Sequence, residues 1–295
     1  MKVLVTGAGG TVGSALMPAL AKRGHEAVRL VRRAPRSASE LLWNPNGQPD
    51  PKLVDGASAI VHLAGESIAG GRWSAEKKSA IRDSRVLGTR TIAKSILAAA
   101  NPPTVLVSGS AIGYYGSRGD EVLTEKSAAG SGFLADVCRA WEDEAQAARP
   151  AGTRVVMLRT SVVLAPGGGA LPKMLPPFRM GLGGRIGSGA QWWSWIALPD
   201  LIELILAALT DGKFQGPLNA ASPNPVTNLE FTKTLGHVLH RPTIFPVPAL
   251  AVKIAFGEMG EELLLASQRV QPAASLAAGF QFQHSGLESA LKAIL

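Results

Sequence analysis

Cysteine is almost absent from this chain, and that absence limits what the protein can be. Among 295 residues only Cys138 carries a thiol, which excludes a disulfide framework and a cysteine metal cluster. A lone cysteine is typical of a reducing compartment, so we expect a cytoplasmic protein without a metal site. The apolar strand pattern starts at residue 3, which predicts that no signal or transit peptide precedes it.

Long apolar runs and dense basic clusters are also missing. Residues 155–164 form an apolar stretch, but Arg159 interrupts it, so we expect no membrane span. The formal net charge is +8, yet the basic residues are scattered and only two tyrosines exist to stack on bases. A nucleic-acid-binding protein, the reading that charge alone suggests, would show strongly salt-dependent binding. We expect instead a small-molecule partner, and neither a nucleic acid nor a membrane.

Short apolar segments alternate with helical ones in the first half of the chain. Strand candidates lie at residues 3–5, 27–31, 59–63, 105–108 and 154–158, and the main helical candidates at 14–23, 75–100 and 133–148. This alternation predicts an α/β fold of Rossmann type, a doubly wound parallel sheet with helices on both faces. Residues 166–189 are rich in glycine and proline, which is typical of a functional lid or of a loose linker. We therefore predict a nucleotide-binding core over 1–165, and a smaller α/β lid and substrate-binding part with a C-terminal helical module over 166–295.

The first thirteen residues, MKVLVTGAGGTVG, predict a strand, a glycine turn and the start of a helix. In such a turn Gly7 allows the sharp bend, Gly10 lets the backbone approach a phosphate, and Gly13 lets the helix pack on the strand. The helix then presents free N–H groups and the positive end of its dipole to an anion. A plain strand-to-helix turn is the alternative, but the order of elements favours a dinucleotide site. Its candidate residues are Thr6, Gly7, Gly9, Gly10, Thr11, Val12 and Gly13.

The residues at the end of the second strand select the nucleotide. A carboxylate there would bind the ribose 2′-hydroxyl of NAD, whereas this chain has Arg32 and Arg33, with Arg36 close by. Guanidinium groups pair with phosphate through two parallel hydrogen bonds. A solvated basic loop is the other reading, but the glycine turn upstream favours NADP(H) as the cofactor.

Several motifs together resemble a known family. They are TGAGGTVG at residues 6–13, HLAG at 62–65, AGESIAGGRW at 64–73, SGSAIGYYG at 108–116, LRTSVVLAPGGG at 158–169, GSGAQWWSWI at 187–196 and GEMGEELLLASQRVQP at 257–272. The chain resembles the extended and atypical short-chain dehydrogenase/reductase superfamily, and within it the uncharacterised "epimerase family" with its own small C-terminal module. The resemblance implies that Leu63, Ala64 and Gly65 line the cofactor, with Arg85 where the superfamily usually has asparagine. It also implies a monomer or a homodimer paired through helices such as 75–100 and 133–148.

The catalytic pattern of that superfamily is broken in this chain. Its tyrosine and lysine, four residues apart on one helix, move the proton, because the ammonium lowers the tyrosine pKa. No Tyr-x-x-x-Lys exists here, and the matching positions fall near Leu134 and Cys138. We expect Cys138 to act as a small buried apolar residue.

Other side chains could supply the missing chemistry. Ser108 is a candidate to polarise a carbonyl, because it ends a strand at the carboxyl edge where ligands bind, and Ser110 is placed alike. Two alternate serines also suit a plain strand edge. A proton could come from Tyr114 or Tyr115 beside a cation, for which the available residues are Arg72, Lys77 and Arg85.

A further set of residues is expected near a substrate, each with a structural alternative. Glu66 is either a general base or a cap, and Arg159 either binds an anionic substrate or is paired where it is buried. The remaining candidates either line a pocket or pack beneath the lid; they are Arg72, Trp73, Trp192 and Trp195.

Two functions follow from these residues. The first is an NADP(H)-binding oxidoreductase or epimerase-like enzyme that transfers a hydride to or from a small hydroxyl or carbonyl substrate, with a sugar nucleotide as one form of it. The second is a non-catalytic NADP(H) sensor or scaffold that has lost the Tyr-x-x-x-Lys relay.

Overall fold

Seven parallel strands form the central sheet. In the computed structural model, which describes residues 1–295, their order is β11-β7-β5-β4-β1-β2-β3. Their bounds are Lys2–Thr6 (β1), Glu26–Val31 (β2), Glu40–Leu42 (β3), Ala59–His62 (β4), Val105–Ala111 (β5), Arg154–Thr160 (β7) and Gly216–Ala220 (β11). The strand order reverses between β1 and β4, and in open parallel sheets ligands bind outside the carboxyl ends of strands at such a reversal. The predicted doubly wound α/β fold is confirmed.

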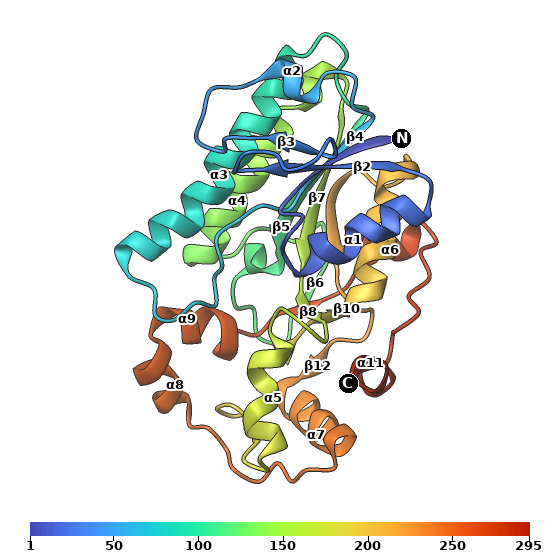
Figure 1. The fold of residues 1–295 in the computed structure, drawn as a ribbon. Helices are drawn as coiled ribbons and strands as arrows, with labels where there is room; N and C mark the ends of the chain where they lie inside the picture. Colours follow the sequence, from blue (N-terminus) through green and yellow to red (C-terminus); the bar gives the residue numbers. More distant parts are fainter.

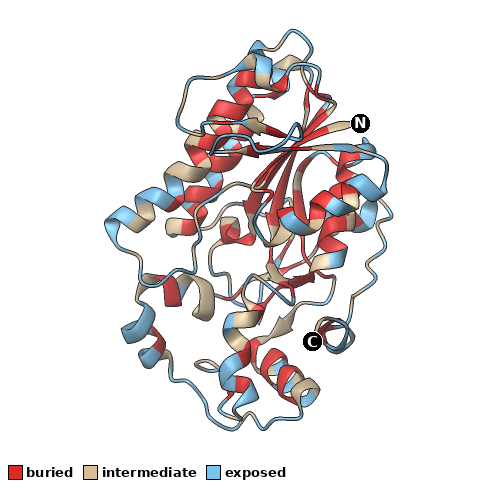
Figure 2. Cartoon of the chain, in the orientation of Figure 1, coloured by how far each residue is buried: buried red, intermediate tan, exposed pale blue.

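Helices cover both faces of the sheet (Figure 1). One face carries α1 (Thr11–Lys22) and α6 (Leu198–Thr210). The other carries α2 (Pro51–Val54), α3 (Ala75–Ala98) and α4 (Phe133–Gln146). Side chains of successive strand residues point to opposite faces of the sheet. Val3 and Val5 therefore pack against α1 and α6, while Leu4 packs against α3. Figure 2 shows the buried residues concentrated in the strands and on the helix sides that face them.

The second half of the chain adds the last strand of this sheet and then a smaller layer. Strand β11 lies beyond residue 165, so the sheet draws residues from both predicted parts. The other short strands pair as β10 with β8, β12 with β9 and β13 with β6; their bounds are Val122–Leu123 (β6), Val162–Leu164 (β8), Trp192–Trp193 (β9), Trp195–Ala197 (β10), Val226–Thr227 (β12) and Arg269–Val270 (β13).

Most helices of the second half, among them α5, α7, α8 and α9, gather below the sheet in Figure 1, whereas α10 packs beside β11. Their bounds are Leu171–Arg179 (α5), Asn228–Leu239 (α7), Ala249–Phe256 (α8), Glu258–Gly260 (α9), Ala273–Ala277 (α10) and Leu287–Ile294 (α11), and a π-helix spans Glu261–Leu265. Short 3₁₀ turns occupy Ile112–Tyr115 and Arg149–Ala151. None of the helices is both long enough and apolar enough to cross a membrane.

The glycine- and proline-rich segment 166–189 contains an ordered helix, α5, which its composition hid. Leu171, Leu175 and Phe178 are buried at helical spacing and pack in one apolar cluster with Trp195. Pro172 lies in the first turn, where the missing N–H costs no hydrogen bond. Tertiary packing therefore makes a helix from residues whose local preference is for loops.

Candidate functional site

The glycine turn between β1 and α1 leaves no room for a side chain at Gly7 or at Gly13. Gly7 has φ of 67°, and a Cβ there would lie 2.8 Å from the carbonyl carbon of Leu63 on the β4 side. A Cβ on Gly13 would overlap the carbonyl oxygen of Gly7, whereas one on Gly9 would meet nothing within 4 Å. Helix α1 begins after Gly10 with no side-chain cap and no acidic residue in its first turn. Its N–H groups are therefore open to an anion, and these residues fit a dinucleotide diphosphate.

A loop from the second half of the chain reaches the same turn. Gly168 packs against Thr11 so closely that a Cβ on Gly168 would overlap the Thr11 hydroxyl. The loop thus packs against the first residue of α1. Sequence position gave no sign that these two residues meet.

Thr6 joins β1 to the end of β4. Its hydroxyl oxygen accepts from the backbone N–H groups of Leu63 (3.0 Å) and Ala64 (3.1 Å) and lies 2.8 Å from Nδ1 of His62. His62 is fully buried, its Nε2 has no partner, and its ring meets Trp43 edge to face. Burial lowers the pKa of His62 to about 4. Thr6, Leu63 and Ala64 therefore set the backbone beside the glycine turn.

The two arginines after β2 differ in what surrounds them. Arg33 donates to both carboxylate oxygens of Glu40 on β3, at 2.7 and 2.8 Å, and Glu40 also accepts from the backbone N–H of Arg36. These donors lower the pKa of Glu40 to about 2. Arg32 is exposed and makes no hydrogen bond or ion pair within the chain. Arg32 thus has no partner within the chain, while Arg33 is held by Glu40.

Arg85 of α3 lies against Gly65, where a Cβ would come within 3.1 Å of the guanidinium carbon. The guanidinium donates to the carbonyls of Glu66 and Ile81, both at 3.0 Å, and lies over the ring of Trp141. No carboxylate pairs with it, and burial lowers its pKa. Arg85 therefore brings an unpaired positive charge to the carboxyl edge of β4.

Both candidate serines on β5 are buried. Ser108 is fully buried and donates to the carbonyl of Gly109, at 3.3 Å. Ser110 donates to Glu142 of α4, at 2.6 Å. Of the two, Ser110 lies nearer the carboxyl edge and beside the α4 positions that replace the usual catalytic pair.

Those replacements are apolar in the structure as well. Leu134 and Cys138 both lie next to Gly113. A Cβ added to Gly113 would be 3.1 Å from the Leu134 Cβ and 3.9 Å from the Cys138 Sγ. Cys138 is 3% exposed, and burial raises the pKa of its thiol to about 12. This environment suits the small buried apolar residue that we expected, and the raised pKa keeps the Cys138 thiol protonated near neutral pH.

Tyr115 belongs to a buried polar network. Its hydroxyl donates to Asn219 (2.7 Å) and accepts from Arg159 (3.0 Å), and burial raises its pKa to about 12. Arg159, 2% exposed, makes two hydrogen bonds of 2.8 Å to Glu142. The paired alternative therefore describes Arg159, since its guanidinium is used within the chain.

Tyr114 lies on the outer side of that network. The Arg159 guanidinium lies 3.5 Å from the centre of the Tyr114 ring. Tyr114 lines a cavity between α4, β7 and β11, away from Leu134 and Cys138. The structure therefore does not bring Tyr114 together with the glycine turn.

Most of the expected substrate residues are bonded within the chain. Glu66 pairs with Lys77 at 2.5 Å, and Arg72 donates to the carbonyl of Ile254. Trp73 donates to the carbonyl of Ile68 and stacks edge-on against Phe133. These contacts place the segment after β4 between α4 and α8.

The two remaining tryptophans have separate places. Trp192 donates to Asp120 at 2.8 Å and lies under the Arg269 guanidinium. Trp195 is 1% exposed and belongs to the apolar cluster with α5 and α7. The packing alternative therefore describes Trp195.

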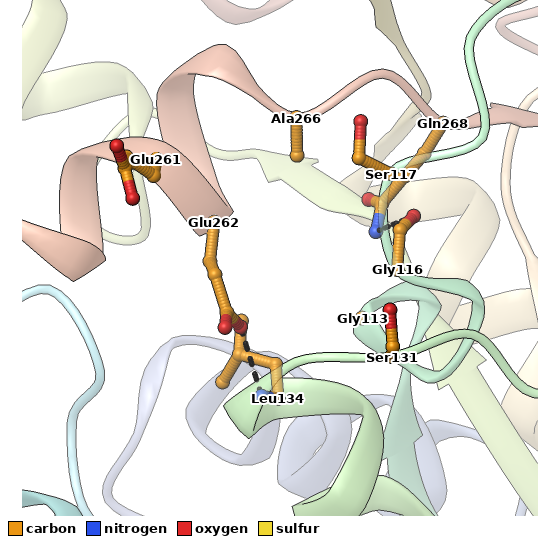
Figure 3. Close-up of a pocket in the computed structure, with 9 residues that line it drawn as sticks. All are labelled: Gly113, Gly116, Ser117, Ser131, Leu134, Glu261, Glu262, Ala266 and Gln268. Carbon is orange, nitrogen blue, oxygen red and sulfur yellow. Dashed lines mark hydrogen bonds between the residues drawn. The ribbon is translucent and has the colours of Figure 1, made fainter.

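A cavity of about 190 Å³ lies where the turn after β5, the start of α4 and residues 261–268 meet (Figure 3). On one side the Glu262 carboxylate accepts hydrogen bonds from the backbone N–H groups of Phe133 and Leu134, both at 2.8 Å. Glu262 therefore caps the N-terminus of α4. Gln268 donates to the carbonyls of Ile112 and Gly116 on the other side. Sequence reasoning missed both residues, because they lie more than a hundred positions from the elements they contact.

The fold and the glycine turn together define a class, the dinucleotide-binding α/β proteins with a doubly wound parallel sheet. Residues 3–221 match the model of the NAD dependent epimerase/dehydratase family, and residues 247–294 match a domain of unknown function, DUF1731. The chain therefore belongs to the NAD-dependent epimerase/dehydratase family. The resemblance inferred from the motifs is confirmed, including the separate C-terminal module.

Relatives cover nearly the whole chain. The epimerase family protein MT2273 of Mycobacterium tuberculosis is 44% identical over 290 residues, 98% of this chain and 96% of that protein. The crystal structure of human epimerase family protein SDR39U1 with NADPH has a TM-score of 0.91 at 35% identity, covering 100% of this chain and 99% of that chain. A nucleoside-diphosphate sugar epimerase from Corynebacterium glutamicum has a TM-score of 0.84 at 39% identity, covering 100% of this chain and 58% of that chain.

Proposed function

We propose that this protein binds NADP(H) and transfers a hydride to or from a small substrate that carries a hydroxyl or carbonyl group. The observation that carries the proposal is an uncapped α1 beside glycines with no room for a Cβ, together with the unpaired Arg32 at the end of β2. The human relative crystallised with NADPH supports the same cofactor. A sugar-nucleotide-like substrate is the form suggested by the name of the C. glutamicum relative.

The residues have separate roles in this proposal. The α1 N–H groups bind the diphosphate, and Arg32 binds the 2′-phosphate, while Glu40 holds Arg33 and the loop after β2 in place. Arg85 places its charge at the nicotinamide end beside Gly65. The cofactor supplies the hydride chemistry, and Ser110, at the carboxyl end of β5, is the hydroxyl assigned to the substrate oxygen, provided that it releases its bond to Glu142.

A non-catalytic NADP(H) sensor is the second candidate. Leu134 and Cys138 favour it, because neither can transfer a proton near neutral pH. Slow oxidation of NADPH with a panel of carbonyl compounds separates the two. Turnover of any compound supports the enzyme, whereas tight NADPH binding without turnover supports the sensor.

The cofactor is tested by titrating NADPH and NADH into the protein and its Arg32→Ala variant. We expect about tenfold preference for NADPH in the wild type and its loss in the variant, because one charge-assisted phosphate contact contributes about 1.4 kcal/mol. Arg29→Ala is the matched control, since Arg29 is also exposed on β2 but lies before its carboxyl end. Equal binding of both nucleotides by the wild type contradicts the NADP(H) assignment.

We also propose a monomer or homodimer in a reducing compartment such as the cytoplasm, acting on a small molecule rather than nucleic acid. The single buried cysteine and the dispersed positive charge support these points. Light scattering of the pure protein and a salt-dependent DNA- and RNA-binding assay test the oligomeric state and the partner.

A further inference from the structure

Exposed apolar side chains are concentrated in one region of the second half of the chain. Of the fourteen large apolar residues that are exposed, eight belong to residues 180–182 and 244–256, and the other six lie at separate positions along the chain. We call the region formed by residues 180–182 and 244–256 the α8 surface. Single exposed apolar residues are normal, whereas a concentration of this kind marks a contact with a protein or with a membrane.

The two segments of the α8 surface lie side by side. The backbone N–H of Phe245 donates to the carbonyl of Gly183, and the N–H of Val247 donates to the carbonyl of Arg185. Figure 1 places α8 and the loop that leads to it from α7 at the periphery of the molecule, and Figure 2 shows both largely exposed. Residues distant along the chain therefore form one outward-facing surface.

Helix α8 has an apolar face that the chain leaves uncovered. Val252 is its one buried residue, whereas Leu250 and Ile254, four positions apart on the opposite face, are 67% and 66% exposed. A helix of eight residues is marginally stable by itself and depends on the packing of its apolar face. The face that carries Leu250 and Ile254 is thus available to a partner outside the chain.

The charge around the α8 surface has one sign. Residues 171–199 and 231–257, which include this surface, contain lysine and arginine but neither aspartate nor glutamate. Arg179, Arg185 and Arg241 are exposed and pair with no carboxylate; Arg185 and Arg241 donate to backbone carbonyls instead. A two-fold contact between copies of the chain would bring both sets of arginines to one interface, which disfavours a second copy. The charge complements an anionic partner.

The backbone of the α8 surface favours lipid over a protein strand. The N–H groups of Met180 and Leu182 donate to backbone carbonyls, as those of the 245–247 loop do, and Pro242, Pro246 and Pro248 have no N–H. Few backbone donors are left to pair with a strand of another protein. A backbone whose polar groups are already bonded enters the apolar boundary of a bilayer at low cost.

We propose that the α8 surface binds the surface of an anionic lipid bilayer, with its apolar side chains at the acyl boundary and the three arginines at the headgroups. The formal net charge of +8 acts in the same direction. The sequence predicted no membrane partner because no apolar run spans a bilayer, but a protein that lies on the bilayer needs no such run. This inference is independent of the proposed function.

The test is co-sedimentation of the full chain with vesicles of phosphatidylcholine, alone or with about one third phosphatidylglycerol. We expect binding to the anionic vesicles to be at least tenfold stronger than binding to the neutral ones, and to weaken as the ionic strength rises.

Two pairs of matched variants place the binding on the α8 surface. Leu250→Glu/Ile254→Glu should weaken binding to anionic vesicles at least tenfold. Leu97→Glu/Leu276→Glu, which adds the same charge at exposed positions of α3 and α10, should weaken it less than threefold.

The arginines are tested in the same way. Arg179→Gln/Arg185→Gln should weaken binding to anionic vesicles at least tenfold, whereas Arg29→Gln/Arg36→Gln, the same loss of charge near β2, should weaken it less than threefold. Urea denaturation of each variant checks that its fold is intact.

Three results overturn the proposal. They are a wild type that stays free of anionic vesicles, equal binding to neutral and anionic vesicles, and equal binding by Leu250→Glu/Ile254→Glu and its control. If the wild type stays free and light scattering shows a dimer that Leu250→Glu/Ile254→Glu separates, the surface belongs to a second copy. A monomer that stays free assigns the surface to an acidic protein partner.

Discussion

The two ends of the sheet's carboxyl edge differ in whether their polar groups are hydrogen-bonded within the chain. At the β1–β2 end, the N–H groups of the first turn of α1 and the Arg32 guanidinium have no partner within the chain. At the β5–β7 end, Ser110, Tyr115 and Arg159 are hydrogen-bonded to Glu142 and Asn219. The first end leaves hydrogen-bond donors unpaired, and the second satisfies its polar groups within the chain.

In the proposed function, this difference separates the nucleotide-binding groups from the buried polar groups of the β5–β7 end. Binding groups must stay unpaired, because their partner is the ligand. Buried polar groups at the other end are satisfied internally, which stabilises the sheet but leaves them little freedom to exchange protons. We therefore expect the largest effect from a substitution that lowers the free energy of unfolding at the β5–β7 end.

Arg159→Met should destabilise the protein by about 3–5 kcal/mol, because it leaves the buried Glu142 without its cation. Urea denaturation measures the loss. Arg90→Met is the matched control. Arg90 of α3 pairs with Glu144, which lies on α4 as Glu142 does, but the Arg90 side chain is 43% exposed. We therefore expect Arg90→Met to lower the free energy of unfolding by at most about 1 kcal/mol. If the double variant Glu142→Leu/Arg159→Met is no more stable than Arg159→Met, the unpaired charge is not the cause.

His62 should make the protein lose stability in acid. Its folded pKa of about 4 lies below its ordinary value of 6.5, so the unfolded chain binds the proton first. The stability it contributes is complete above pH 6.5 and falls by about 3 kcal/mol as the pH drops to 4. Urea midpoints of wild type and His62→Asn between pH 7.5 and 4 measure this. The variant should lose less, and an equal loss in both would assign the effect to other groups.

The β1–β2 end is tested by Gly13→Ala, which places a methyl group on the Gly7 carbonyl oxygen. We expect NADPH affinity to fall by about 100-fold, because the turn must shift away from the geometry that holds the diphosphate. Gly9→Ala is the control, since its Cβ would meet nothing within 4 Å, and it should change the affinity less than about threefold. Fluorescence titration with NADPH measures the affinity of both variants. Equal losses at Gly13 and Gly9 would mean that the packing of the turn does not determine NADPH affinity.

The smallest effect is expected from Tyr115→Phe. Loss of its bonds to Asn219 and Arg159 should lower stability by about 1–2 kcal/mol and leave NADPH binding unchanged. Tyr114→Phe should alter neither quantity, because the Tyr114 hydroxyl makes no hydrogen bond within the chain. Loss of turnover in Tyr115→Phe at unchanged stability would assign the hydroxyl a part in proton transfer and break the contrast between the two ends.

The glycine turn could be predicted because its signal is local. The residues that make it are adjacent in sequence. Gly7 and Gly13 are needed because a side chain at either position would clash with backbone in or near the turn. The places of Leu134 and Cys138 follow instead from the resemblance, which implies that the superfamily's tyrosine and lysine would fall near these two positions.

The partners of the charged residues could not be predicted. Arg33 looks equivalent to Arg32 in the sequence, and only β3, a strand of three residues, brings Glu40 to one of them. Helix α5 was hidden by prolines for a related reason, since buried contacts outweighed local preference. Pairing across a sheet depends on which strands become neighbours, and short strands leave little pattern.

The sequence by itself determined the doubly wound sheet, the dinucleotide turn and the absence of the usual proton relay. These features follow from periodicity, from glycine sterics and from the residue types present. The tertiary structure alone decided that Arg32 is free and Arg33 is held, that Tyr115 and Arg159 close a buried network, and that Glu262 caps α4 across 128 positions. The reason is that hydrogen bonds and ion pairs depend on separation in space, which a folded chain sets by packing elements that are distant along it.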